Sequence, residues 1–163
     1  MHKVRLLSFR QEIMFTHLIY RSFSQVPLTE RQLHHILEKS QTNNLQNEIT
    51  GLLLYRNNTF IQLLEGPEKQ VLSCMQRIRK DPRHFGSSVV FLTKSDERLF
   101  PSWSMSHIPQ KKIIKPLDTI TTVVEASMRL DLPPRGILLS ILKSFISPEY
   151  LEAASGITFK KSA

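Results

Sequence analysis

The sequence contains one cysteine, only five glycines and no long run of apolar residues. Because a single cysteine cannot form a bridge within the chain, a disulfide framework is excluded, and a reducing cytoplasm is the expected compartment. The longest apolar stretches, such as Leu52 to Tyr55, are far shorter than the roughly 18 residues that a membrane-spanning helix needs. The N-terminus is basic, but Arg10 and Glu12 interrupt it before an apolar region typical of a signal peptide develops. We therefore expect neither a membrane segment nor secretion.

The composition is that of a globular protein with an excess of positive charge. The chain has 163 residues, of which 40% are hydrophobic, and its 22 Lys and Arg against 14 Asp and Glu give a formal net charge of +8. A chain of this length buries roughly 70% of its unfolded surface and needs no structural metal. The charge favours attraction to polyanions, but it suits an acidic protein partner equally well.

The apolar pattern predicts the order β-α-β-β-α-β-β, the split βαβ arrangement of ferredoxin-like α+β folds. Two consecutive asparagines, Asn57 and Asn58, tolerate the backbone angles of a tight hairpin between the second and third strands. We expect a five-stranded mixed sheet with adjacent first and third strands and two helices on one face. The expected strands are Phe15–Arg21, Ile49–Tyr55, Thr59–Leu64, Ser88–Thr93 and Leu99–His107.

Two amphipathic helices are expected between these strands. The first begins at a capping box formed by Thr29 and Gln32, and we expect it to end at the polar run 40–44, so that Asn44 follows it. Pro67 opens the second helix. Its expected apolar face consists of Val71, Leu72, Met75 and Ile78.

The composition changes after Pro109. A lysine-rich connector over residues 111–115 leads into two expected helices, around 117–130 and 135–146, which are separated by two prolines. The second carries an apolar stripe that would not stay exposed on a small monomer, so it should cover the sheet face opposite the first two helices. This stripe consists of Ile137, Leu138, Ile141, Leu142 and Phe145.

Polar side chains on otherwise apolar strands are the candidates for a site. Tyr20 and Gln62 lie on the first and third expected strands, where burying a carboxamide costs a few kcal/mol unless it is hydrogen-bonded. The two side chains can satisfy each other, or the backbone can satisfy both. Trp103 and Met105 have core packing as their ordinary interpretation. Cys74, which has no neighbouring histidine to activate it, is expected to be a small buried hydrophobe.

Three common functions of this topology lack their motifs. An RNA-recognition module needs an aromatic-rich third strand, whereas Thr59–Leu64 offers one aromatic residue, so nucleic acid is the less favoured partner. A small phosphatase would need a glycine-rich anion loop, and residues 22–27 contain no glycine. The six histidines include no His-x-x-x-His pair. We predict neither a metal site nor catalytic residues.

Several blocks of residues occur in a characteristic order along the chain. They are Tyr20-Arg-Ser22, Asn43-Asn44 followed by Ile49-Thr-Gly51-Leu-Leu-Leu-Tyr55, Phe60-Ile-Gln62-Leu-Leu-Glu65-Gly66-Pro67, Asp81-Pro-Arg83-His84, and Arg98-Leu-Phe100-Pro-Ser-Trp103-Ser-Met105. Together, from about Phe15 to Ile108, they resemble the BLUF family of blue-light sensors, which bind FAD noncovalently. The combination of ordered blocks is far more specific than any single block.

The resemblance implies an FAD site between the first two helices. Tyr20 and Gln62 match the family's photoactive pair, and Trp103 and Met105 match the residues that relay the signal. The implied cofactor-binding residues are Asn43 and Asn44 near the flavin carbonyl, Ile49 and Phe60 as walls of the ring, and Asp81, Arg83 and His84 near the ribityl and phosphate end.

The implied function is blue-light sensing without enzymatic activity, with output to an unidentified partner protein and with self-association. The chain would then divide into an N-terminal extension (1–14), an FAD-binding sensory domain (15–108), and a connector with C-terminal helices (109–163). Two rival functions are a flavin-dependent oxidoreductase and a flavin-free module that contacts a polyanion. The sequence has no Gly-x-Gly-x-x-Gly motif for a second cofactor, as an oxidoreductase of that type would need.

Overall fold

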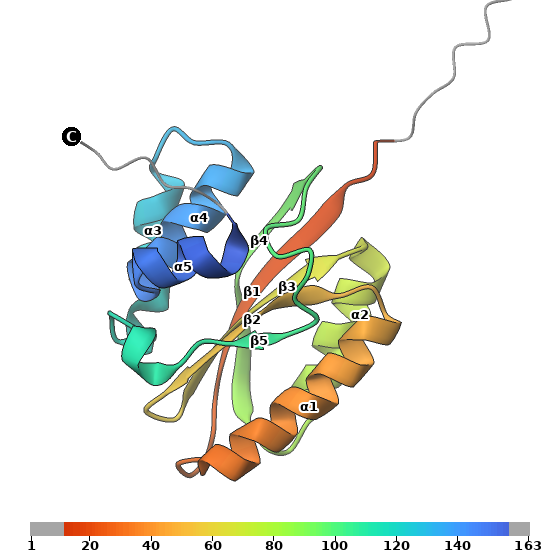
Figure 1. Cartoon of the computed structure of the whole chain (residues 1–163), viewed down its shortest axis with the longest axis vertical. Helices are drawn as coiled ribbons and strands as arrows, with labels where there is room; N and C mark the ends of the chain where they lie inside the picture. Colours follow the sequence, from red (N-terminus) through yellow and green to blue (C-terminus); the bar gives the residue numbers. More distant parts are fainter. Residues whose placement is uncertain (1–11, 157–163) are drawn as a thin grey trace, which may run out of the picture.

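Five strands form one mixed sheet in the order β4-β1-β3-β2-β5 (Figure 1). The computed structural model describes residues 12–156, so most of the predicted N-terminal extension lies outside the described residues. The strands are β1 (Phe15–Phe23), β2 (Thr50–Arg56), β3 (Thr59–Gly66), β4 (Phe85–Ser95) and β5 (Ser106–His107). All neighbours pair antiparallel except β2 and β5, which pair parallel. The ferredoxin-like α+β fold and the adjacency of the first and third strands are confirmed.

Tight backbone geometry joins β2 to β3. Asn57 and Asn58 have φ angles of 48° and 60°, so the hairpin predicted from these asparagines is confirmed. Near the start of β2, a Cβ atom on Gly51 would lie 1.9 Å from the carbonyl oxygen of Leu63. Glycine is required for this close approach, and its backbone N–H donates to the carbonyl oxygen of Trp103 at 2.9 Å.

The helix α1 (Glu30–Gln46) begins as predicted but ends later. The Thr29 side chain accepts from the backbone N–H of Gln32, and the Gln32 side chain accepts from the backbone N–H of Thr29, which is the predicted capping box. The prediction that the helix ends at the polar run 40–44 is wrong, because Asn44 in that run is buried and its side chain donates to the carbonyl oxygen of Ser104. The buried residues of α1 are Leu33, Leu37 and Asn44.

The helix α2 (Glu68–Arg79) follows Pro67 and lies on the same face of the sheet as α1 (Figure 1). Val71 and Met75 are buried as predicted, whereas Leu72 is 42% exposed, so its assignment to the apolar face is wrong. Cys74 is buried in its place, as the small hydrophobe that the sequence predicts.

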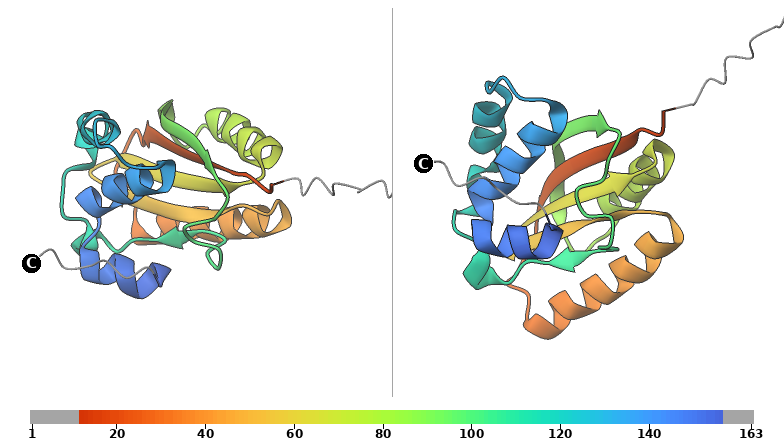
Figure 2. Two further views of the ribbon diagram at one scale, coloured as in Figure 1. Left: turned by 90° about the horizontal axis from the view of Figure 1, so that it is seen from above. Right: turned by 45° about the horizontal axis from the view of Figure 1, so that its top comes forward.

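The C-terminal part of the chain covers the opposite face of the sheet (Figure 2). Its elements are the short 3-10 helices η1 (Gln110–Lys112) and η2 (Leu117–Thr119) and the helices α3 (Ile120–Met128), α4 (Pro134–Phe145) and α5 (Pro148–Ser155). Leu138, Ile141 and Phe145 share one buried cluster with Ile19 and Leu63 of the sheet, which confirms that the tail packs on this face. Helix α5 was not predicted, because its eight residues bury only one side chain and leave no recognisable stripe. Within residues 12–156, no helix is both long and apolar enough to cross a membrane.

The last strand is much shorter than predicted. Of the segment 99–107, only Ser106 and His107 pair with β2, and the rest consists of turns and bends. We refer to residues 98–105 as the connecting segment, because they link the end of β4 to β5. Pro101 has no N–H to donate to a ladder, and the N–H groups of the two preceding residues bond to a side chain instead, so a strand cannot form there.

Candidate functional site

A cavity of about 700 Å³ lies between α1 and α2 above the sheet. It contains eight of the eleven residues predicted for the site, which come from α1, from β1 and β3, and from the turn after α2. These eight are Tyr20, Asn43, Asn44, Phe60, Gln62, Asp81, Arg83 and His84. The fold therefore brings together side chains that are spread over more than sixty positions of the sequence.

Tyr20 and Gln62 form a buried pair at the floor of the cavity. They are directly opposite each other on the antiparallel strands β1 and β3, and their exposed fractions are 4% and 5%. The Tyr20 hydroxyl donates a hydrogen bond to Gln62 Oε1. Burial raises the pKa of Tyr20 well above its ordinary value, so the phenol keeps its proton at neutral pH. The Gln62 carboxamide thus accepts a hydrogen bond from a phenol that stays protonated in the dark.

The other end of the Gln62 carboxamide faces Met105. Gln62 Nε2 lies 3.1 Å from Met105 Sδ, and Met105 is 1% exposed. Met105 belongs to the buried cluster on the α1 and α2 side of the sheet, although its own atoms do not line the cavity. Because the two ends of a carboxamide are a donor and an acceptor, Gln62 joins the phenol on β1 to the connecting segment.

Trp103 lies on the side of the sheet that the tail helices cover. Its ring stacks on that of Phe100 with 4.9 Å between the centroids, and it packs against the cluster that the tail helices form with the sheet. Of the two predicted relay residues, the structure therefore places Met105, and not Trp103, beside Gln62. Ile49 is buried among the residues around the site but does not line the cavity, so its assignment as a wall of the ring stays a prediction.

Helix α1 holds the connecting segment through two side-chain amides. Asn44 Nδ2 donates to the carbonyl oxygen of Ser104 at 2.9 Å, and Gln41 Nε2 donates to that of Met105 at 2.8 Å. Asn44 thus lines the cavity and contacts the connecting segment at the same time. The oxygen of its carboxamide contacts only the Cys74 thiol, at 4.0 Å, among the described residues.

Positive charge gathers at the mouth of the cavity. Lys39, Arg77 and Lys80 line it together with the Asp81–Arg83 ion pair. The side-chain hydrogen bond from Arg83 lowers the pKa of Asp81 to about 2, and burial lowers the pKa of the nearby His84. At neutral pH the mouth therefore carries several cations and one paired carboxylate, a charge distribution suited to a phosphate group.

Several residues that line the cavity were not assigned to the site from the sequence. Cys74, Ser22 and Ser40 line the cavity, as do the lysines and Arg77 at its mouth. Ser22 lies two positions after Tyr20 on β1, and this alternation is a signal that would have placed it on the same face. Its hydroxyl is buried and has no hydrogen-bond partner among residues 12–156, which marks the floor of the cavity as a place for a polar ligand.

The fold and the cavity together define a small ligand-binding domain on a ferredoxin-like sheet. A family model described as "Sensors of blue-light using FAD", the BLUF family, matches residues 15–106. The chain belongs to the BLUF family. It is accordingly a blue-light sensor that uses FAD, as the ordered sequence blocks predict.

Relatives with similar sequences are light-regulated proteins. The beta subunit of a photoactivated adenylate cyclase from Euglena gracilis is 33% identical over 135 residues, which are 82% of this chain and 14% of that protein. The blue light- and temperature-regulated antirepressor BluF of Escherichia coli K12 is 39% identical over 72 residues, which are 44% of this chain and 18% of that protein. The chain therefore spans only a small part of these relatives.

This chain matches two solved structures over nearly the whole length of those structures. The BLUF protein BlrB in its dark state superposes with a TM-score of 0.60 at 27% identity, over 82% of this chain and 96% of that one. The structure of BlsA in its photo-activated state has a TM-score of 0.59 at 24% identity, over 91% of this chain and 99% of that one. The second likeness is one of fold, and it includes most of the tail.

The cavity fits FAD in its donor set. The apolar ring of Phe60 and the side chains of Leu53 and Ile78 suit a flat aromatic ring system, while the unpartnered Ser22 hydroxyl and the Asn44 carboxamide supply polar contacts. The cations at the mouth suit the diphosphate. The residues that would hold the cofactor are thus present in one continuous cavity.

Proposed function

We propose that the chain senses blue light through a rearrangement of the Tyr20–Gln62 pair and passes it to a partner protein without enzymatic activity of its own. The observation that carries the proposal is the buried series Tyr20, Gln62, Met105, in which each side chain contacts the next. Bound FAD supplies the absorption of blue light and, when excited, an acceptor for an electron and a proton. The protein supplies the groups that respond.

Gln62 is the residue whose contacts would change. Its acceptor end receives the phenolic proton, and rotation or tautomerisation of the carboxamide exchanges the group that faces Met105. Such an exchange is worth about 1 kcal/mol net, or more for buried groups, because one hydrogen bond is lost and another is made. This suffices to shift the populations of two arrangements of the connecting segment, but it is too little to drive a large domain motion.

The tail helices are the route to a partner. Phe100 in the connecting segment belongs to the same buried cluster as α3, α4 and α5, and Trp103 packs against that cluster. Met128 at the end of α3 and Leu130 and Leu132 in the link to α4 are exposed to 60%, 47% and 43%. An exposed apolar group of this kind supports contact with another protein, either a downstream partner or a second copy of the chain.

A visible spectrum of the purified protein tests the proposal. We expect bound FAD whose absorption shifts to longer wavelength in blue light and returns in darkness. An oxidoreductase would instead turn over an added electron donor in the dark, and a flavin-free module would carry no bound flavin. A flavin spectrum that does not respond to light would contradict the proposed function.

Replacing Asn44 by alanine is expected to weaken FAD binding. A buried flavin carbonyl that loses its donor costs about 1 to 3 kcal/mol, which corresponds to roughly a 5-fold to 150-fold loss of affinity. Arg83→Ala should have a smaller and salt-sensitive effect, because Arg83 is at the exposed mouth. Both affinities can be measured by titrating the apoprotein with FAD. The matched control is Gln46→Ala, which changes an exposed amide at the last residue of α1 outside the cavity. Equal affinities for all variants would contradict the assignment of the pocket.

A further inference from the structure

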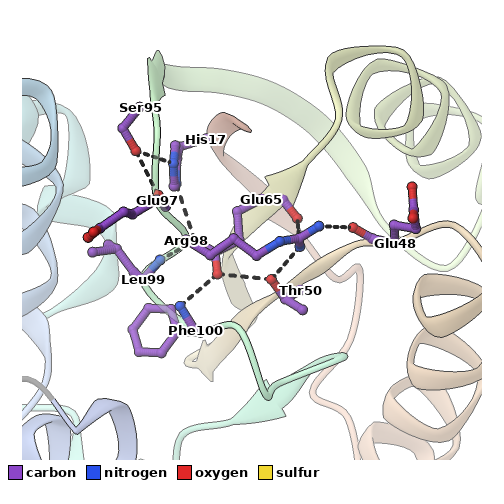
Figure 3. A network of polar contacts seen from close by, with 9 residues as sticks. All are labelled: His17, Glu48, Thr50, Glu65, Ser95, Glu97, Arg98, Leu99 and Phe100. Carbon is purple, nitrogen blue, oxygen red and sulfur yellow. Dashed lines mark hydrogen bonds and ion pairs between the residues drawn. The ribbon is translucent and has the colours of Figure 1, made fainter. Parts of the chain in front are cut away.

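A buried carboxylate holds the beginning of the connecting segment. Glu65 on β3 is 0% exposed, and its carboxylate accepts hydrogen bonds from the backbone N–H of Leu99 at 2.9 Å and of Phe100 at 2.7 Å (Figure 3). The hydroxyl of Thr50 on β2 donates to the same carboxylate at 2.9 Å. His17 on β1, which is equally buried, places Nδ1 3.2 Å from Glu65 Oε2. Groups from two neighbouring strands and from the connecting segment therefore meet on one side chain.

Arg98 fixes the same place from the other side. Its guanidinium donates to Thr50 Oγ1 at 2.7 Å and to the backbone carbonyl oxygens of Glu65 at 3.0 Å and Glu48 at 2.6 Å (Figure 3). The Thr50 hydroxyl thus accepts from Arg98 and donates to Glu65. Side chains, and not a strand ladder, attach the start of the connecting segment to the sheet.

The Glu65 carboxylate stays ionised in this place. Burial alone would raise the pKa of Glu65, but the adjacent His17 ring and the hydrogen bonds from the backbone N–H groups of Leu99 and Phe100 outweigh burial and hold the pKa below its ordinary value. An ionised carboxylate has only acceptor sites, so it can receive both backbone N–H groups at once.

Gln62 and Glu65 hold opposite ends of the connecting segment. They are three residues apart on β3 and therefore point to opposite faces of the sheet. Gln62 contacts Met105 on the cavity side, whereas Glu65 binds Phe100, whose ring belongs to the buried cluster under the tail. Strand β3 thus contacts the connecting segment at both ends, at Met105 beside the cavity and at Phe100 beside the tail.

We propose that Glu65 is a positioning residue for the light response, whose carboxylate fixes Leu99 and Phe100 so that a displacement of Met105 is passed to the tail helices. The inference rests on the proposed function. With Leu99 and Phe100 fixed, the segment has few arrangements, and a change at Met105 must be taken up at Trp103, whose ring stacks on Phe100 and packs against the tail cluster. If Leu99 and Phe100 are not held, the segment absorbs the displacement of Met105 by rearranging along its own length, and α4 is not affected.

Glu65→Gln is the test, because it keeps the shape and removes the second acceptor. The new amide group would point its own N–H atoms at one of the two backbone donors, leaving that buried donor without a partner. We expect the variant to bind FAD and to show the full red shift, but to recover in darkness at least about fivefold faster, since the freed segment lets Met105 return over a lower barrier. The light-minus-dark difference in hydrogen exchange over residues 134–145 should fall by at least about half relative to wild type.

The matched control is Glu68→Gln, the same chemical change at an exposed glutamate at the start of α2, which should behave as wild type. If Glu65→Gln does not fold, Thr50→Val removes one donor to the same carboxylate and should change both readouts in the same direction by a smaller factor. Wild-type recovery and wild-type exchange differences in Glu65→Gln, or in Thr50→Val where that variant is used, would overturn the inference. A wild-type protein without any red shift would instead overturn the proposed function, so the two failures are distinguishable.

Discussion

Replacing Tyr20 by phenylalanine should abolish the light-induced spectral shift and leave FAD bound. The substitution keeps the ring that packs in the buried cluster but removes the hydroxyl that donates to Gln62. Without that hydroxyl, no donor bonds to the acceptor end of the Gln62 carboxamide. Rotation of the carboxamide then exchanges no hydrogen bond with Tyr20 and is not favoured. We expect a flavin content close to that of wild type and no reversible red shift in blue light, measured by absorption before, during and after illumination.

Tyr55→Phe is the matched control for this experiment. Tyr55 is buried in the same cluster, but its hydroxyl bonds to Ser24 and to the backbone N–H of Leu28, away from Gln62. The control should lose about 1 kcal/mol of stability, the usual value of one hydrogen bond, and keep its light response. A normal reversible shift in Tyr20→Phe would refute the role assigned to the pair.

Removal of the tail by truncation after Pro109 should leave a protein that aggregates. Each fully buried apolar side chain contributes roughly 1.5 to 3 kcal/mol, whereas the whole stability of a domain is about 5 to 15 kcal/mol. The tail provides half of the cluster on one face of the sheet, and its loss would expose the sheet residues of that cluster to water. These are Ile19, Leu52, Leu54, Ile61, Leu63 and Phe91. Size-exclusion chromatography and light scattering of the truncated chain would measure the effect.

A shorter truncation controls for the loss of chain length. Ending the chain after Gly156 keeps η1, η2 and all three tail helices, so comparison with this variant separates the loss of those helices from the loss of the last residues of the chain. If the chain truncated after Pro109 stays monodisperse and binds FAD, the sheet does not depend on the tail for its stability, and the route to a partner through α4 loses its structural basis.

The sequence predicts the elements of this fold better than their ends. The capping box at Thr29 and the paired asparagines of the hairpin are local signals, and both are found where they were expected. The tail's apolar stripe predicted which surface it must cover, because an amphipathic helix on a small protein needs an apolar partner. The end of α1 was misjudged because a run of polar residues looks like a loop when the buried contacts of Asn44 are unknown.

The geometry of the site depends on contacts that no local pattern encodes. The expected strand over 99–107 shrinks to two residues because Glu65, more than thirty positions earlier, takes the N–H groups of Leu99 and Phe100. Because residues 99–105 form turns and not a strand, the sequence alone does not show that Met105, and not Trp103, lies beside Gln62. A glutamate in an apolar strand is a visible signal of a buried partner, but its partners become known only in three dimensions.

The shortness of β5 has a mechanical consequence. The central strands β1 and β3, which carry Tyr20 and Gln62, are paired along both edges by long ladders and form the stiffest part of the sheet. β5 lies at the edge, and only its two residues pair with β2 in the ladder. Beyond them, the backbone N–H of Gly51 donates to Trp103 and that of Ile108 donates to Leu53. Under the proposed function, a small displacement at Gln62 would therefore bend the rim of the sheet before it deforms the centre. The flexibility of the β5 edge, more than the distance from Gln62 to the tail, therefore determines which part of the sheet moves.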